Sequence, residues 1–197
     1  MIDLETIAVI LGLANIVLVV RRSLWNYPFG IAMVSLYFFI FADAKLYSDA
    51  LLQIFFLTVQ LYGWWNWIRG RDAQGAVIVR HAGAGAMLGW IGAILAGTAL
   101  WGWLMHRYTD AALPWWDASI AMTSIAAQIL LSRRFIENWP LWVATDAIAV
   151  GVYAAKDLDK TAMLYAVFLV IAAWGWWDWL RAGRAQHRAV PAQDSPA

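Results

Sequence analysis

Gly63-Trp64-Trp65-Asn66-Trp67-Ile68-Arg69 is followed, 112 positions further along the chain, by Gly175-Trp176-Trp177-Asp178-Trp179-Leu180-Arg181. Without a gap, the same offset places Arg21-Arg22 on Arg133-Arg134, Asn26 on Asn138 and Pro28 on Pro140. Sixteen of the forty-nine positions from Arg21 to Arg69 are identical at this offset, which is more than a biased composition explains. Because self-similarity at a fixed offset is typical of repeated structural units, we expect two copies of one unit.

The composition of the chain is strongly apolar. Hydrophobic residues make up 63% of the 197 residues and charged residues only 14%. A soluble domain has roughly 45–50% apolar and about 25% charged residues, and it could not bury this much apolar surface. Most of the chain is therefore expected to lie in lipid. The fifteen Trp residues suit this interpretation, because indole rings favour the membrane interface.

Seven apolar segments have the roughly 17–25 residues that a helix needs to cross a bilayer. They cover about 4–20, 25–42, 46–68, 84–105, 115–132, 139–155 and 161–180. The first follows an acidic start without a basic region or a cleavage site, so we expect a retained span and not a signal peptide. Two adjacent three-helix repeats would be inverted, but the unmatched fourth segment restores a common orientation. The sequence thus predicts an all-α integral membrane fold: seven transmembrane helices as two parallel three-helix repeats plus a linker helix.

The repeat also predicts the division of the chain. We expect the first three-helix repeat over 1–69, a loop and the linker helix over 70–112, and the second repeat over 113–181. The remaining residues, 182–197, include two prolines and are expected to form a disordered cytoplasmic tail. Small residues spaced four apart in the fourth segment predict close helix packing, between subunits in one interpretation.

The basic residues are distributed unequally between the two ends of the predicted helices. Ten lie on one side, namely Arg21, Arg22, Arg69, Arg71, Arg80, Arg133, Arg134, Arg181, Arg184 and Arg188. The other side has four, namely Lys45, Arg107, Lys156 and Lys160. Because cytoplasmic loops carry the excess of Lys and Arg, we expect the N-terminus outside and the C-terminus in the cytoplasm.

Asp146 stands near the middle of the sixth segment, where a carboxylate costs about 2.5–3.5 kcal/mol on insertion scales. Its counterpart in the first repeat is Val34, whereas a purely architectural residue would be expected in both copies. Trp142 lies one helical turn before Asp146 and faces the same way. A carboxylate beside aromatic faces suits a flat organic cation, so we expect a substrate site here. The alternative is a hydrogen-bonded Asp that only packs helices.

Further polar and aromatic residues lie at similar depths or at segment ends. The candidate substrate-binding set adds Asn15, Tyr37, Gln60, Gln128 and Tyr153, together with Trp116 and Asp117 at the outer start of the fifth segment. Amides in lipid often only join helices, so for each one packing and ligand contact are equally open interpretations. Substrates of repeat-built transporters usually bind near the midplane between the repeats, which favours a small-molecule transporter.

Other function classes lack the residues they need. The chain has no Cys, its three His residues lie apart, and no Gly-rich nucleotide-binding loop is found. We therefore expect no metal, no cofactor and no catalytic residue. No basic run alternates with aromatic residues outside the apolar segments, so nucleic acid is not expected as a partner.

Several motifs resemble those of the PnuC family of bacterial vitamin transporters, and the resemblance extends to Arg181. They are Trp25-Asn26-Tyr27-Pro28-Phe29-Gly30, Tyr62-Gly63-Trp64, Trp116-Asp117, the run from Arg133 to Trp142, and Thr161-Ala162-Met163-Leu164-Tyr165. The most specific element is Glu137-Asn138-Trp139 followed by Trp142, and it adds Asn138 to the candidate site.

This resemblance implies a SWEET-like fold and a homotrimer in the bacterial inner membrane. It further implies facilitated diffusion of nicotinamide riboside, with a separate cytoplasmic kinase trapping the substrate by phosphorylation. Relatives in that family carry thiamine or riboflavin, and thiamine is also a flat cation, so the acidic and aromatic pair cannot separate these substrates. From another class, a membrane scaffold or an enzyme subunit would use the intramembrane polar residues for packing alone.

Overall fold

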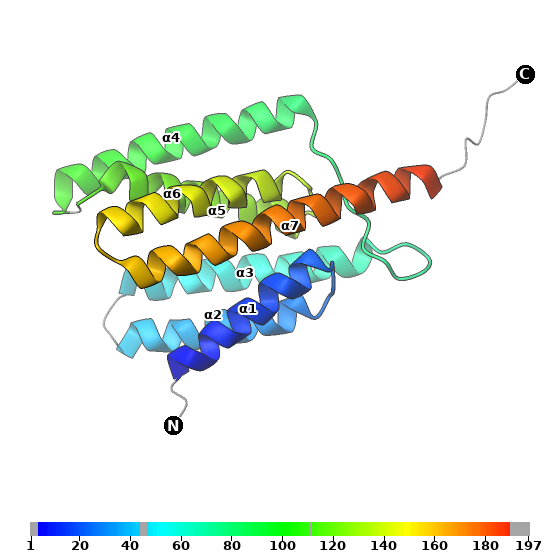
Figure 1. Ribbon diagram of the computed structural model, residues 1–197, viewed down its shortest axis with the longest axis horizontal. Helices are drawn as coiled ribbons and strands as arrows, with labels where there is room; N and C mark the ends of the chain where they lie inside the picture. Colours follow the sequence, from blue (N-terminus) through cyan, green and yellow to red (C-terminus); the bar gives the residue numbers. More distant parts are fainter. Residues whose placement is uncertain (1–3, 44–46, 111, 190–197) are drawn as a thin grey trace, which may run out of the picture. The chain divides into compact units, whose positions relative to one another are not determined.

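The computed structural model describes residues 4–43, 47–110 and 112–189. Within these ranges the regular elements are α1 (Leu4–Val20), α2 (Asn26–Asp43), α3 (Tyr47–Arg69), α4 (Ala84–Tyr108), α5 (Pro114–Ser132), α6 (Asn138–Ala155) and α7 (Asp159–Ala189) (Figure 1). Each predicted segment is a helix, and apart from the end of α7 the bounds agree to within three residues. Lys45, which we counted on the outer side, lies outside the described residues.

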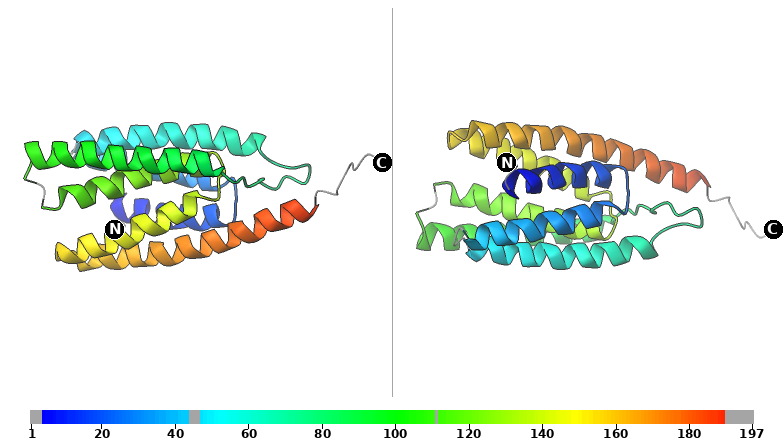
Figure 2. Two further views of the ribbon diagram at one scale, coloured as in Figure 1. Left: turned by 90° about the horizontal axis from the view of Figure 1, so that it is seen from above. Right: turned by 90° about the horizontal axis from the view of Figure 1, so that it is seen from below.

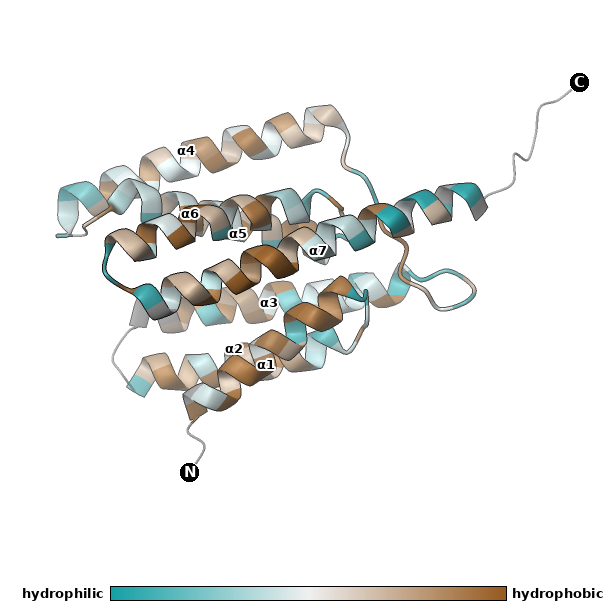
Figure 3. Cartoon of the chain, in the orientation of Figure 1, coloured by the Kyte–Doolittle hydropathy of each residue, from teal (hydrophilic) through white to brown (hydrophobic). Residues whose placement is uncertain are grey.

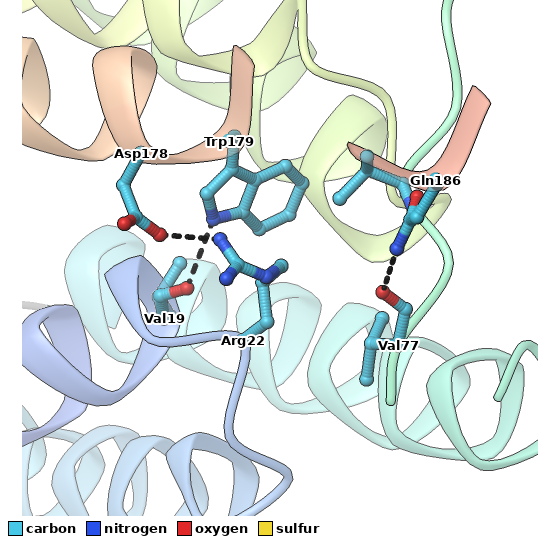
Figure 4. A network of polar contacts seen from close by, with 7 residues as sticks. Val19, Arg22, Val77, Asp178, Trp179 and Gln186 are labelled. Atoms are coloured by element: carbon cyan, nitrogen blue, oxygen red, sulfur yellow. Dashed lines mark hydrogen bonds and ion pairs between the residues drawn. The ribbon is translucent and has the colours of Figure 1, made fainter. Parts of the chain in front are cut away.

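The C-terminal end of α7 corrects one expectation. We expected disorder from Ala182, but α7 continues to Ala189, and only the tail from 190 lies outside the described residues. This stretch is rich in Ala and Arg, which favour helix. Gln186 also anchors it, because its Nε2 donates to the Val77 carbonyl and its Oε1 accepts from the Val79 N–H, each at 3.1 Å (Figure 4). Figure 3 shows α7 becoming hydrophilic towards this end.

The described residues fall into two compact units. The first unit comprises those of Met1–Val79, Ser132–Arg134 and Asp178–Ala197, and the second unit comprises those of Arg80–Leu131 and Phe135–Trp177. The first unit therefore holds α1 to α3 with the end of α7, and the second holds α4, α5, α6 and most of α7.

Within the first unit α2 packs against both α1 and α3, and its direction is opposite to theirs (Figures 1 and 2). Glycines permit the close approach. A Cβ at Gly12 would lie 2.9 Å from the Met33 sulfur, and a Cβ at Gly63 would lie 2.7 Å from the Tyr27 hydroxyl. Small residues of this kind let neighbouring helices approach closely in lipid.

In the second unit, glycines likewise permit close approach of α4 to α5 and of α6 to α7. A Cβ at Gly102 would lie 2.5 Å from the Trp115 ring, and a Cβ at Gly175 would overlap the Trp139 ring. The outer faces are apolar, since Leu88 and Leu95 on α4 and Val170 on α7 are among the most exposed side chains. By length and hydropathy alone, Ala84–Tyr108 and Thr161–Gln186 qualify as membrane spans. Exposed apolar faces of this kind are typical of surfaces that lipid or another subunit covers.

The turns after α1 and α5 are the same local structure. Arg22 and Arg134 are 112 positions apart, and both have positive φ, 53° and 66°. After α1 the Ser23 N–H donates to the Leu18 carbonyl at 2.9 Å, and after α5 the Phe135 N–H donates to the Leu130 carbonyl at 3.0 Å. This 6→1 bond closes a helix with a left-handed residue, a position usually taken by glycine. At this turn the sequence repeat is therefore also a repeat of backbone conformation.

Candidate functional site

Three polar residues of α6 and one Trp share one side of the helix. Asn138, Trp142, Thr145 and Asp146 follow one another at spacings of three or four residues or lie side by side. Asn138 and Thr145 are almost completely buried, and Asp146 is 4% exposed. Pro140 is tolerated because it lies in the first turn, where no intrahelical partner for its N–H exists.

Three of these side chains have polar atoms without a partner in the part of the chain that the structure describes. Asn138 donates through Nδ2 to the Phe135 carbonyl at 2.6 Å, which leaves its buried Oδ1 unsatisfied. The Thr145 hydroxyl is buried and unsatisfied. The Asp146 carboxylate is buried and makes no hydrogen bond or ion pair with the described residues. Buried polar groups are nearly always hydrogen-bonded, so this side of α6 is suited to a polar ligand or water.

The aromatic residues near this side of α6 have different surroundings. Trp142 is half-buried and lies one turn before Asp146. Trp139 is buried with its ring against Gly175 of α7, so it packs helices. Tyr153 stacks on Tyr165 of α7, with ring centroids 5.1 Å apart. Of the aromatic residues predicted for the site, Trp142 is therefore the one best placed beside the carboxylate.

In the first unit, two predicted amides converge on α2. A Cβ at Gly30 would overlap Nε2 of Gln60 and would lie 2.7 Å from Nδ2 of Asn15. Asn15 donates to the Asn26 carbonyl at 2.6 Å, so part of its role is to join α1 to α2. Gln60 is 5% exposed and has no hydrogen bond to the described residues. Tyr37 lies on the same helix as Gly30 and stacks on Phe41, with centroids 5.5 Å apart.

The remaining predicted residues belong to α5 and do not gather around Asp146. Asp117 is bound through both carboxylate oxygens by the Lys156 ammonium, each at 2.8 Å, and Trp116 beside it is exposed. Lys156 follows α6 ten residues after Asp146, about 15 Å along the helix at 1.5 Å per residue. Gln128 lies half-buried near the other end of α5. The structure thus separates Asp117 and Trp116 from the side of α6 that bears Asp146.

Figure 4 shows a polar network in the first unit that sequence reasoning missed. Arg22 pairs with Asp178, and the Trp179 indole N–H donates to the Val19 carbonyl at 3.2 Å. In the sequence, this network could have been suspected from Asp178, which stands where the first repeat has Asn66 in an otherwise similar motif. Thr145 was also not predicted as a site residue, although the sequence places its hydroxyl next to Asp146 in an apolar segment.

Comparison with known proteins gives a consistent result. Residues 3–181 match the family described as nicotinamide mononucleotide transporter. The nicotinamide riboside transporter PnuC of Escherichia coli K12 is 28% identical over 206 residues, with 92% of this chain and 86% of that protein covered. The riboflavin/roseoflavin transporter RibM of Streptomyces davaonensis is 31% identical over 188 residues at the same coverage.

A solved structure gives the same result for the fold. The crystal structure of the vitamin B3 transporter PnuC matches with a TM-score of 0.72 and 25% identity, covering 92% of this chain and 82% of that one. The predicted fold class, an all-α membrane protein with two three-helix repeats and a linker helix, is confirmed by this likeness together with the seven helices.

Proposed function

Because the chain belongs to the nicotinamide mononucleotide transporter family, we propose that it carries nicotinamide riboside across the membrane. The resemblance to PnuC found in the sequence is confirmed. The chain is a multi-pass membrane transporter of this family and not an enzyme, as its relatives show. The identity of the substrate is our proposal.

The observation that carries the proposal is the buried Asp146 carboxylate, which lacks a partner among the described residues. Nicotinamide riboside is a pyridinium cation, and it could supply the missing positive charge. A delocalised cation also suits the ring of Trp142, one turn away. The carboxamide or ribose hydroxyls of the substrate could satisfy Asn138 Oδ1 and the Thr145 hydroxyl.

We propose that transport occurs by facilitated diffusion, as the resemblance to PnuC implies. An uncoupled carrier needs a site that binds the substrate moderately and releases it on either side. Phosphorylation by a cytoplasmic kinase would then make uptake irreversible, because the added charge prevents return through a site built around a carboxylate. We propose this division of work between carrier and kinase.

Riboflavin is a second candidate, because RibM is a relative at comparable identity. Its ring system is flat but uncharged, so it could stack on Trp142 without using the charge of Asp146. Thiamine is also a flat cation, so the acidic and aromatic pair alone does not separate it from nicotinamide riboside. The charge of the substrate therefore distinguishes riboflavin from the two cations. Competition experiments distinguish nicotinamide riboside from thiamine.

Uptake into proteoliposomes tests the proposal. We expect labelled nicotinamide riboside to equilibrate across the membrane, and to accumulate only when a nicotinamide riboside kinase and ATP are enclosed. Excess unlabelled thiamine and riboflavin should compete weakly. Flux of riboflavin without flux of nicotinamide riboside would transfer the assignment to the second candidate, and no flux of any of the three would overturn all three substrate assignments.

We also propose a homotrimer in the bacterial inner membrane with a cytoplasmic C-terminus. On α4, open space surrounds Gly85, Gly89 and Gly92, and neighbouring Leu88 is exposed, as expected of a helix face available to another subunit. Native mass spectrometry should give three copies, and loss of trimers with large residues at Gly89 would support this face.

The orientation rests on the ten arginines at one set of helix ends. A C-terminal fusion to a reporter that is active only in the periplasm should stay silent. The repeat boundaries, 1–69 and 113–181, are part of the same proposal.

A further inference from the structure

Three equivalent positions differ in a reciprocal way between the repeats. In the first repeat, Gly30 lies between the amides of Asn15 and Gln60. At an offset of 112, the second repeat has Trp142 in place of the glycine, with Ala127 and Ala172 in place of the two amides. One repeat has a small residue between two larger polar ones, and the other has a large ring between two small ones.

A neighbouring pair of contacts has the same arrangement in both repeats. In the first unit the Tyr27 ring lies against Gly63, and in the second unit the equivalent Trp139 ring lies against Gly175. Each glycine belongs to a helix that is antiparallel to the helix bearing the ring. One turn further along the pair, Gly30 meets Gln60, so by the same geometry we expect Trp142 to face Ala172.

The same reasoning applies to the pair of helices on the other side. Gly30 meets Asn15 of α1, and Gly12 meets Met33 one turn away. Because α5 and α6 are joined by the same turn as α1 and α2, with Arg134 in the place of Arg22, we expect Ala127 to face Trp142 as Asn15 faces Gly30. Ala127 and Ala172 are both completely buried, as expected of residues covered by a large ring.

We propose that Ala127 and Ala172 are positioning residues that hold the Trp142 indole in its substrate-binding orientation. Their methyl groups leave room for the ring, and a longer side chain at either position would occupy that room. The inference rests on the proposed function only in that Trp142 contacts the substrate. In this proposal Ala127 and Ala172 act through Trp142: small residues at these two positions permit an aromatic ring, whereas the first repeat has two amides there.

A double-mutant cycle between positions 172 and 142 tests the proposal. Ala172→Gln introduces the side chain of the first repeat, and we expect it to weaken binding of nicotinamide riboside by about tenfold or more, because overpacking displaces the indole. In a Trp142→Gly background, which recreates the first-repeat arrangement, Ala172→Gln should cause no additional loss. The unfolding midpoint without ligand should follow the same pattern, with a decrease in the Trp142 background only.

Two variants serve as controls. Ala172→Ser, which stays small, should bind as the wild type does. Ala166→Gln introduces the same side chain at an exposed position of α7 and should leave substrate affinity unchanged. Equal losses from Ala172→Gln in both backgrounds, or wild-type affinity in the single variant, would overturn the proposal. If Ala172→Gln alone does not fold but the double variant with Trp142→Gly does, this rescue supports the proposal. If neither variant folds, the proposal is contradicted.

The midpoint cycle does not depend on the substrate. If the wild type binds riboflavin and not nicotinamide riboside, the proposed function fails while the cycle can still succeed, with riboflavin as the titrated ligand.

Discussion

The turns after α1 and α5 have the same backbone conformation, whereas the side chains that could meet a ligand differ between the two repeats. The turns centred on Arg22 and Arg134 have the same hydrogen bonds, and Asn26 and Asn138 each donate through Nδ2 to the carbonyl three residues earlier, at 2.6 Å. Yet Val34 in the first repeat corresponds to Asp146 in the second. Duplication explains the architecture, and the divergent positions point to where each copy has acquired its own chemistry.

The largest expected effect tests the shared packing. Tyr27→Ala and Trp139→Ala should each lower the free energy of unfolding by about 3–5 kcal/mol, because both rings are buried against a glycine of the neighbouring helix. Denaturant titrations of protein in detergent would measure this, with the exposed Trp116→Ala as a control that should cost less than about 0.5 kcal/mol. A harmless change at either ring would show that the two repeats do not share this packing.

The arginines of the two turns should differ in importance. Arg134 is buried and donates to the carbonyls of Gly70 and Ile78 at 2.9 and 3.2 Å, so Arg134→Gln should cost about 1.5–3 kcal/mol. Arg22 pairs with Asp178 in a partly exposed position, so Arg22→Gln should cost only about 1 kcal/mol or less, and less still in high salt. Unfolding midpoints at two salt concentrations would measure both, and a reversed order would contradict this assignment.

Substrate affinity should depend on the ring that the second repeat has in place of Gly30. Trp142→Ala should weaken nicotinamide riboside binding by about two- to thirtyfold, from a cation–π contribution of about 0.5–2 kcal/mol. Trp142→Phe should restore part of the loss. Isothermal titration would measure it, with Trp174→Ala on the exposed side of α7 as a control. Unchanged affinity in Trp142→Ala would make this residue a membrane anchor only.

The smallest expected effect concerns the ion pair of the second unit. Asp117→Asn and Lys156→Met should each lower the free energy of unfolding by about 0.2–1 kcal/mol, because the pair is partly exposed. Since Asp117 is engaged by Lys156 and is distant from Asp146 along the helices, neither change should alter substrate affinity. A loss of affinity in Asp117→Asn that Lys156→Met does not share would return Asp117 to the substrate site.

Most of the fold could be predicted from periodic information in the sequence. Helix lengths follow from apolar runs matched to bilayer thickness, and the 112-residue offset identifies the repeats without any contact being known. The extension of α7 could not be predicted, because it depends on Gln186 meeting the backbone of a loop more than a hundred residues earlier. Local composition carries no information about such a partner.

The site was predictable only in part, for the same reason. Depth in an apolar segment identifies Asp146, because burying a carboxylate is costly wherever the helix lies. Whether an amide packs or binds depends on its neighbours, however, as shown by Asn15, which donates to the Asn26 carbonyl. The partners in the ion pairs of Asp117 and Asp178 lie 39 and 156 residues away along the chain, so no spacing rule indicated them.

The most direct test compares the affinity of purified protein for nicotinamide riboside with that for its dihydro form, which has nearly the same shape without the positive charge. We expect the wild type to prefer the cation. Asp146→Asn should weaken binding of the cation by about ten- to hundredfold, equivalent to about 1.5–3 kcal/mol, with little change for the neutral form. The same substitution at exposed Asp110 should change neither affinity. Equal losses for both ligands, or wild-type affinity for the cation in Asp146→Asn, would contradict the pairing of a cationic substrate with this carboxylate.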